Sequence, residues 1–169
     1  MIYLNNSKLA HNIGEWFTPE GIQHIAFRLS HINRFNGSVG AYSVAQHSVL
    51  VAEQLPDHLK LAGLLHDVSE AYIGDITRPL KGHIQGYDEL ESFYDDVIDS
   101  HYGVKVRHPL VKEADQRMVV TEAESFGMPT EHFAMVGKPY DFTIIKMSAK
   151  EAAYQFCATY KELRHGIIV

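Results

Sequence analysis

The sequence contains a single cysteine and a single tryptophan among its 169 residues. One thiol, Cys157, cannot form an intrachain disulfide, and its isolation favours a reducing compartment. No apolar run approaches the ~20 residues that a transmembrane helix needs, and the first residues lack the basic start and apolar middle of a signal peptide. A formal net charge of −6 disfavours an extended nucleic-acid surface. We therefore expect a cytoplasmic protein that binds neither membranes nor nucleic acids.

Apolar residues recur through the sequence at helical spacing. They make up 46% of the chain, which fits a single domain over residues 1–169 with a sizeable core. In 90–102, apolar side chains return at i, i+3, i+4, i+7 and i+8, and Gly103 is placed to end that helix. Pro109 suits the first turn of another helix, and Ser148-Ala-Lys-Glu151 is a capping-box pattern. With further helices expected over 21–31, 43–55 and 57–66, the sequence predicts an all-α fold class.

Two stretches do not fit this helical pattern. Residues 74–82 contain glycine, proline and closely spaced cations, and residues 127–139 contain two prolines and two glycines. We expect the second stretch to be a surface excursion and the first to be a loop that carries binding groups, since such groups tend to lie on loops held by a rigid scaffold. Residues 39–42 and 143–147 could be extended, although nothing in the sequence pairs them.

The most informative feature is the pair His66-Asp67. The two side chains emerge together from the apolar run Leu61-Ala-Gly-Leu-Leu, where burying a charge is costly unless it is paired or bound to a metal. His47 lies inside another apolar segment, and Asp115 falls on the inner face of the helix predicted after Pro109. Taken alone, each is more often a satisfied core histidine or an ion-paired carboxylate.

Taken together, these residues indicate a metal site. Three predicted helices each aim imidazole or carboxylate at a common interior, through His47, through His66-Asp67 and through Asp115. Two nitrogen and two oxygen ligands suit zinc or a first-row transition ion such as cobalt or manganese better than calcium, and they leave coordination positions for water. The sequence therefore predicts a divalent metal ion as cofactor.

The same four residues match a known signature. His47, His66-Asp67 and Asp115 resemble the H…HD…D pattern of the HD-domain metal-dependent phosphohydrolases, and the resemblance covers about residues 22–163. It implies an HD-domain orthogonal helix bundle that hydrolyses phosphate esters or anhydrides. Longer motifs resemble the bacterial 5′-deoxynucleotidases and the phage dATP triphosphohydrolases, which implies the cytoplasm of a bacterium or of its phage-infected cell. These motifs are Asn33-Arg34-Phe35, Tyr42-Ser-Val-Ala-Gln-His47, Leu65-His66-Asp67-Val-Ser-Glu70 and Arg78-Pro79-Leu80-Lys81.

The resemblance also implies catalytic roles for Glu70 and Asp75. Glu70 would orient the attacking water or hold a second ion such as Mg²⁺, and Asp75 would contact the sugar 3′-hydroxyl or that second ion. Without the resemblance, Glu70 would be a solvated charge one turn beyond His66, and Asp75 would be a turn residue after Gly74. The implied substrate is a small deoxynucleotide of the dATP or dAMP type.

Phosphate and sugar contacts are implied for four further residues. Arg34 would bind phosphate through its planar fork. Phe35 stands where the bacterial nucleotidases carry tryptophan, so the way the sugar is selected departs from theirs. At least one of Arg78 and Lys81 would face the phosphates, because a polyphosphate carries more charge than one arginine and one metal neutralise. Each cation could otherwise be a surface charge.

Other functions remain open at this point. An HD phosphodiesterase or phosphatase could act on another nucleotide, cyclic or signalling. A di-iron HD oxygenase would need extra histidines, for which His83, His101 and His108 are available but stand outside apolar, motif-like settings. A non-catalytic nucleotide sensor would be expected to lack part of the constellation. Trp16 could pack on a base or in the core, and the amphipathic 90–102 segment and the aromatic-rich last helix favour a homo-oligomer.

Overall fold

The described part of the protein consists of α-helices joined by turns and short loops. The computed structural model describes residues 21–132 and 137–165, so Trp16 lies outside the described residues. Within them, no strand forms and an isolated antiparallel bridge joins Asn33 to Ser43. The predicted all-α class is confirmed. The helices are α2 (Gly21–His31), α3 (Val44–Glu53), α4 (Asp57–Leu65), α5 (Glu70–Ile73), α6 (Arg78–Lys81), α7 (Tyr87–Tyr102), α8 (Pro109–Ser125) and α9 (Ala149–His165), with 3₁₀ turns at Arg34–Gly37 and Thr130–His132.

The caps expected from the sequence form at both kinds of helix end. At α9, Ser148 N donates to Glu151 Oε2 at 2.8 Å and Glu151 N donates to Ser148 Oγ at 3.3 Å, which is a reciprocal capping box. Gly103 ends α7 at φ 67°, a left-handed conformation that glycine adopts at little cost. The other end of α7 lies three residues earlier than predicted, because Gly86 turns the chain at φ 80° directly before Tyr87.

One local prediction needs correction. The segment 74–82 is not loop throughout, because residues 78–81 form the single turn α6, with Pro79 in the first turn where its missing N–H costs nothing. The segment 143–147, for which the sequence indicated no pairing strand, is hydrogen-bonded to a side chain. Gln46 Nε2 donates to the Ile145 carbonyl at 2.7 Å, and Met147 N donates to Gln46 Oε1 at 2.9 Å.

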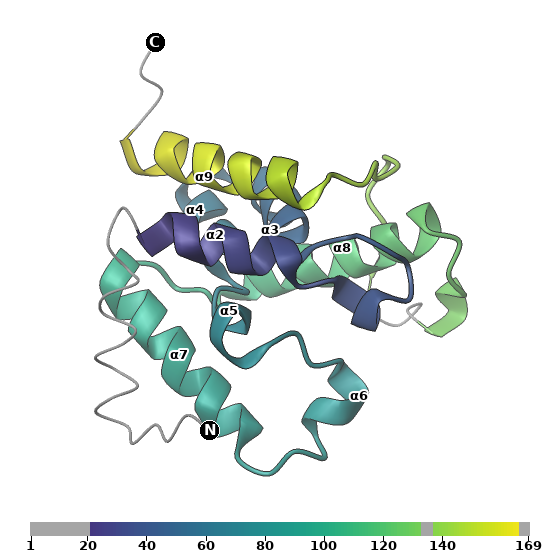
Figure 1. Ribbon diagram of the computed structural model, residues 1–169, viewed down its shortest axis with the longest axis horizontal. Helices are drawn as coiled ribbons and strands as arrows, with labels where there is room; N and C mark the ends of the chain where they lie inside the picture. Colours follow the sequence, from purple (N-terminus) through teal and green to yellow (C-terminus); the bar gives the residue numbers. More distant parts are fainter. Residues whose placement is uncertain (1–20, 133–136, 166–169) are drawn as a thin grey trace.

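The helix α3 occupies the centre of the fold. In Figure 1, α9 lies across α2, α3 and α4, while α8 contacts α3 and α4 on another side. One apolar cluster on the α9 side contains Leu29, Ala45 and Phe156, and a second on the α8 side contains Val51 and Met118. Because α3 belongs to both clusters, a polar residue on it, such as His47, is removed from solvent. No helix in the described ranges is long and apolar enough to cross a membrane.

Candidate metal centre

The four predicted ligands converge at one point, from three different elements. His47 on α3 places Nε2 at 3.3 Å from His66 Nε2, 3.5 Å from Asp67 Oδ2 and 3.1 Å from Asp115 Oδ1. His66 lies directly after α4. Its own Nε2 lies 3.2 Å from Asp67 Oδ2 and 3.9 Å from Asp115 Oδ1, which is on α8. Residues up to 68 positions apart in the chain therefore present their ligand atoms to a common centre.

These separations fit a coordination sphere. With metal–ligand bonds of about 2.1 Å, neighbouring ligand atoms lie about 3.0 Å apart at octahedral angles and about 3.4 Å apart at tetrahedral angles. His47, His66 and Asp67 form a group that could hold a metal ion. Asp115 is not part of that group, but its Oδ1 lies beside it, 3.1 Å from His47 Nε2 and 3.9 Å from His66 Nε2.

Both histidines are oriented with Nε2 toward the centre. His66 Nδ1 lies 2.7 Å from the Gly63 carbonyl oxygen, which can only accept, so Nδ1 carries the proton. His47 Nδ1 lies 2.5 Å from Glu122 Oε1, a carboxylate oxygen that likewise accepts. A partner that fixes the tautomer in this way leaves the other nitrogen free to bind a metal, which is the usual arrangement in metal sites.

The carboxylates around the imidazoles shift their pKa values. Burial and the charge of Arg34 act to lower the pKa of His47, but Glu122 and Asp115 outweigh them and raise it to about 9. Burial also opposes the shift at His66, yet Asp67 raises the pKa of His66. The imidazoles in turn hold the pKa of Asp67 and of Asp115 below the usual range, against burial. Protons thus compete with a metal ion for this cluster.

The metal-free protein is expected to lose stability as the pH rises from about 6.5 to about 9. The pKa of His47 is raised from 6.5 to about 9 in the folded chain, so the folded state binds this proton more tightly than the unfolded state. That stabilisation is complete below the ordinary pKa and is lost as the pH rises through the folded value. Urea unfolding of metal-stripped protein over a pH series measures it. A free energy of unfolding that rises across this interval would contradict the contacts of His47.

Glu122 is a site residue to which the sequence analysis assigned no role. It is fully buried. Oε1 accepts from His47 Nδ1 and from the Tyr42 hydroxyl at 2.8 Å, and Oε2 accepts from Arg34 Nε at 3.2 Å and Nη2 at 3.1 Å. Burial favours its protonated form, but Arg34 and His47 outweigh burial and lower the pKa of Glu122. Its position seven residues after Asp115 places it on the same face of α8, a signal that the sequence does contain.

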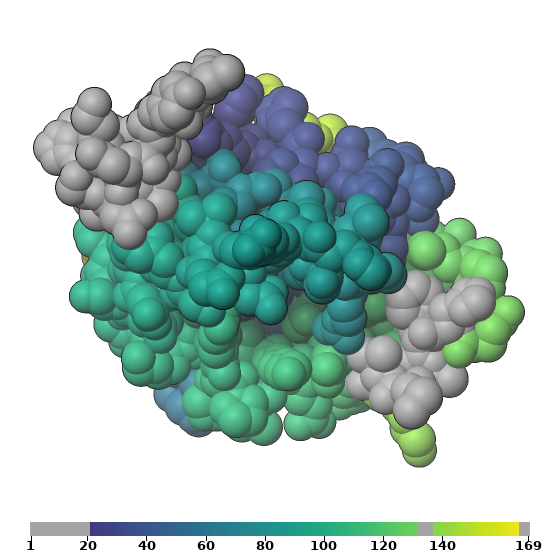
Figure 2. All heavy atoms as spheres, turned by 90° about the horizontal axis from the view of Figure 1, so that it is seen from below, coloured from purple at the N-terminus to yellow at the C-terminus, as the bar shows by residue number. Residues whose placement is uncertain are grey.

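A pocket of about 660 Å³ opens beside the ligand cluster. Its volume lies within the range of about 300–1,000 Å³ typical of small-molecule sites. Figure 2 shows a hollow in this face of the molecule, between the teal segment that precedes α7 and the green α8. Every predicted catalytic and substrate-binding residue lines the pocket, together with both carboxylates of the predicted metal site, Asp67 and Asp115. The lining residues are Arg34, Phe35, Asp67, Glu70, Asp75, Thr77, Arg78, Pro79, Lys81, Asp115 and Val119.

The comparisons with known proteins place the chain in a family without assigning an activity. No family model matches the sequence. The chain is 36% identical over 148 residues to the "Uncharacterized protein YfdR" of Escherichia coli (strain K12), covering 84% of this chain and 83% of that protein. This chain belongs to the YfdR family. It is also 34% identical over 136 residues to the "Uncharacterized protein RCAP_rcc00048" of Rhodobacter capsulatus, covering 70% of this chain and 69% of that protein.

The pocket cations of this YfdR-family chain differ in how tightly the protein holds them. Arg34 is buried, and beyond its bonds to Glu122 its Nη1 lies 3.5 Å from Asp67 Oδ2. Lys81 donates from Nζ to Glu91 Oε1 at 2.7 Å and lies over the Tyr87 ring. Arg78 is exposed to solvent. In this pocket, a bound anion would therefore contact Arg34, whose side chain is held by hydrogen bonds, and Arg78, whose exposed side chain is free to change its rotamer.

Glu70 is a buried acidic side chain whose carboxyl group does little to stabilise the fold. It is only 5% exposed, and its Oε2 has no hydrogen-bond partner among the described residues. Burial, and then the charges of Asp67 and Asp75, raise the pKa of Glu70 well above its usual range. Burial also raises the pKa of Asp75. After α4 ends, i→i+3 hydrogen bonds from Val68 and Ala71 keep the chain winding, so Glu70 follows His66 by about one turn, as predicted.

Phe35 projects into the pocket from a strained turn. Phe35 and Asn36 have φ values of 55° and 51°, both left-handed. Such a conformation costs on the order of 1–3 kcal/mol per residue outside glycine and is common at functional sites. The turn is held by Arg34 N donating to the Tyr42 carbonyl at 2.9 Å and Ser38 N donating to the Phe35 carbonyl at 3.0 Å. The backbone therefore sets the direction in which the Phe35 side chain leaves the turn.

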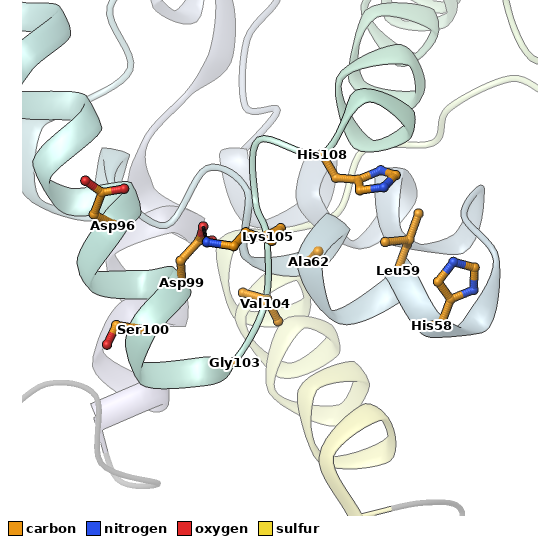
Figure 3. A pocket seen from close by; sticks show the side chains of 10 residues that line it. All are labelled: His58, Leu59, Ala62, Asp96, Asp99, Ser100, Gly103, Val104, Lys105 and His108. Carbon is orange, nitrogen blue, oxygen red and sulfur yellow. Dashed lines mark hydrogen bonds and ion pairs between the residues drawn. The ribbon is translucent and has the colours of Figure 1, made fainter.

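A second hollow lies away from this centre. It has a volume of about 490 Å³ and lies between α4, the end of α7 and the segment that leads to α8, with His58, Asp99, Lys105 and His108 among its lining residues (Figure 3). Asp99 is already engaged there, accepting from Val106 N and from Lys105 Nζ. His108 accepts from Leu110 N at 3.2 Å.

A di-iron site would need extra histidine ligands. In the described part of the chain, the ligand cluster includes none of the candidates His83, His101 and His108.

Proposed function

We propose that this chain is a metal-dependent phosphohydrolase of the HD-domain type that acts on deoxynucleotides of the dATP or dAMP kind. The observation that carries the proposal is the position of the four-ligand cluster, on the wall of a pocket that also presents a buried arginine and an unpartnered carboxyl group. A divalent ion, a phosphate-binding cation and an acid–base group are what hydrolysis of a phosphate ester requires.

His47, His66, Asp67 and Asp115 would hold the ion. Their two nitrogen and two oxygen donors suit zinc, cobalt or manganese. When bound, such an ion supplies Lewis-acid polarisation of a phosphoryl oxygen and a water of lowered pKa. The pocket side would also accommodate an additional Mg²⁺ at Glu70 and Asp75, because oxygen ligands suit that ion and both carboxyl groups line the pocket.

The remaining pocket residues would orient the reactants. Glu70 would align the attacking water through Oε2, which makes no structural hydrogen bond, and would take its proton when a nearby cation favours the ionised carboxylate. Arg34 would bind the phosphate through Nη1, and Arg78 would add a second positive charge. Lys81 is already paired with Glu91, so we assign it to holding α6 in place beside Arg78. A monophosphate would give deoxynucleoside and phosphate, and a triphosphate would give deoxynucleoside and tripolyphosphate.

Phe35 and Asp75 would select the sugar. A phenyl ring packed against C2′ leaves no room for a ribose hydroxyl, and Asp75 would accept a hydrogen bond from the 3′-hydroxyl. The hydrogen-bonded turn at Phe35 supports this role, because a mobile backbone would let the ring move aside for a hydroxyl. A carboxylate left unpaired by the wrong sugar adds to the discrimination.

Replacing Phe35 with alanine is expected to raise the turnover of ribonucleotides while changing that of deoxynucleotides less. The reason is steric, since the substitution removes the ring proposed to lie against C2′. The measurement is kcat/KM for AMP, dAMP, ATP and dATP in both proteins. Equal kcat/KM for ribo- and deoxynucleotides in the unaltered protein would contradict the proposed selection of the sugar. An equal loss of kcat/KM for both kinds of nucleotide in Phe35→Ala would contradict it as well.

The substrate class is tested by metal-supplemented hydrolysis of a nucleotide panel. The panel contains deoxynucleoside mono- and triphosphates, the matching ribonucleotides and cyclic nucleotides, with products separated chromatographically. The proposal predicts cleavage of deoxynucleotides, with deoxyadenylates among the good substrates. Cleavage of cyclic nucleotides alone would favour an HD phosphodiesterase, and cleavage of none would contradict the proposal. A homo-oligomer and a cytoplasmic location remain predictions.

A further inference from the structure

We propose that Glu122 is a positioning residue for metal binding, which fixes His47 as a ligand, and that Arg34 and Tyr42 hold the Glu122 carboxylate in place. The metal-binding part stands on the ligand cluster alone. The further part, that Arg34 thereby links phosphate binding to metal binding, rests on the proposed function.

The two oxygens of Glu122 have separate partners. Oε1 faces His47 Nδ1 at 2.5 Å and the Tyr42 hydroxyl at 2.8 Å, and Oε2 faces Nε and Nη2 of Arg34. Glu122 and His47 are both 0% exposed, so these bonds are removed from bulk solvent. An ionised carboxylate without a solvating partner would be costly at this depth, and the buried guanidinium supplies the compensating charge.

The contact with His47 determines which ring nitrogen can bind a metal. A carboxylate accepts and does not donate, so it keeps the proton on Nδ1 and leaves the Nε2 lone pair for the centre formed with His66, Asp67 and Asp115. His66 obtains the same tautomer from a backbone carbonyl, which no substitution of side chains removes. On the Nδ1 side, the partner of His47 is therefore a single side chain, that of Glu122.

The contact with Arg34 uses one edge of the guanidinium and leaves the other to the pocket. Nε and Nη2 donate to Glu122, while Nη1 lies 3.5 Å from Asp67 Oδ2, and Arg34 lines the pocket. The same carboxylate thus orients a metal ligand on α3 and a cation proposed to bind phosphate. The position of Glu122 on α8 therefore affects both His47 and Arg34.

Glutamine at position 122 cannot reproduce this pattern. Its amide has one oxygen and one NH₂ group, so one of the two faces must present a donor. Arg34 is permanently charged and has no acceptor, which forces the amide oxygen toward Arg34. The NH₂ group then faces His47 Nδ1 and favours the opposite tautomer, with the proton on the nitrogen that should bind the metal.

Glu122→Gln is therefore expected to bind Zn²⁺ or Co²⁺ about 10–100-fold more weakly, the usual loss when the partner of a ligating histidine is removed. Competition with a chromophoric chelator measures this affinity without any substrate. Glu124→Gln is the matched control, because it makes the same substitution at an exposed position of α8. Unchanged affinity in folded Glu122→Gln would overturn the inference, and so would an equal loss in Glu124→Gln.

A second measurement needs no variant and decides the matter if Glu122→Gln does not fold. Long-range ¹H–¹⁵N spectra of the zinc-loaded protein report the tautomer of each histidine. We expect His47 to carry its proton on Nδ1, in a strong hydrogen bond. A His47 with Nδ1 unprotonated would overturn the inference. Both measurements are independent of hydrolysis. A protein that binds metal but cleaves no nucleotide would therefore contradict the proposed function, while the metal affinity and the His47 tautomer would still decide the role of Glu122.

Discussion

Replacing His66 with alanine is expected to abolish metal binding and nucleotide hydrolysis together. His66 Nε2 lies within 3.9 Å of the ligand atoms of His47, Asp67 and Asp115, so its loss opens the centre of the cluster. The affinity for metal should fall by more than the roughly 10–100-fold loss that an outer partner causes. Metal analysis and hydrolysis of the purified variant measure both effects, and Asp67→Ala should behave alike.

A control and a stability readout accompany this test. His83→Ala removes an exposed histidine outside the cluster and should keep full metal content and activity. An ion held by these ligands would connect α3, α8 and the segment after α4, so the unaltered protein should gain about 2.7 kcal/mol of stability at a free metal concentration 100 times its Kd. His66→Ala should gain little. Full metal occupancy with full activity in His66→Ala would refute the ligand assignment.

Replacing Glu70 with alanine is expected to lower kcat by about 10²–10⁴-fold, the usual scale for a positioned acid–base group, while one metal ion stays bound. The side chain is buried with an unpartnered oxygen, so the fold does not depend on its hydrogen bonds. Activity should therefore fall without a matching loss of stability. Steady-state kinetics, metal analysis and thermal unfolding of the same preparation separate these effects.

The control for Glu70 is Glu124→Ala, which removes an exposed glutamate from α8 and should leave kcat unchanged. Glu70→Gln keeps the side-chain volume and should lose turnover to a similar degree. Such a result would show that the loss in Glu70→Ala does not come from the cavity that alanine leaves. An unchanged kcat in Glu70→Ala would return this residue to the role of an ordinary helix charge.

Much of the fold could be predicted because its signals are local. The helix at 21–31 has the predicted bounds, and the capping box at Ser148 and the left-handed Gly103 form as expected. The convergence of His47, His66-Asp67 and Asp115 was also predictable, because polar side chains on the inner faces of three helices must share the interior that those faces enclose. The distances between their ligand atoms confirm that prediction.

The remaining features depend on contacts between distant parts of the chain. Glu122 meets His47, Tyr42 and Arg34 across 75, 80 and 88 positions, and no local pattern pairs them. Lys81 meets Glu91 across a turn and a helix start, a spacing that no helical rule covers. The left-handed backbone of Phe35 had no signal either, since a glycine or asparagine would normally mark it.

The central claim is that one divalent ion in the four-ligand cluster enables nucleotide hydrolysis. The most direct measurement titrates metal-free protein with Co²⁺ or Mn²⁺ and follows, in the same samples, the ions bound per chain and the rate of dAMP and dATP hydrolysis. The account predicts that the rate rises in proportion to the first ion bound, and that His66→Ala shows neither change. Full hydrolysis by the metal-free protein, or full occupancy of the cluster with no cleavage of either nucleotide, would contradict it.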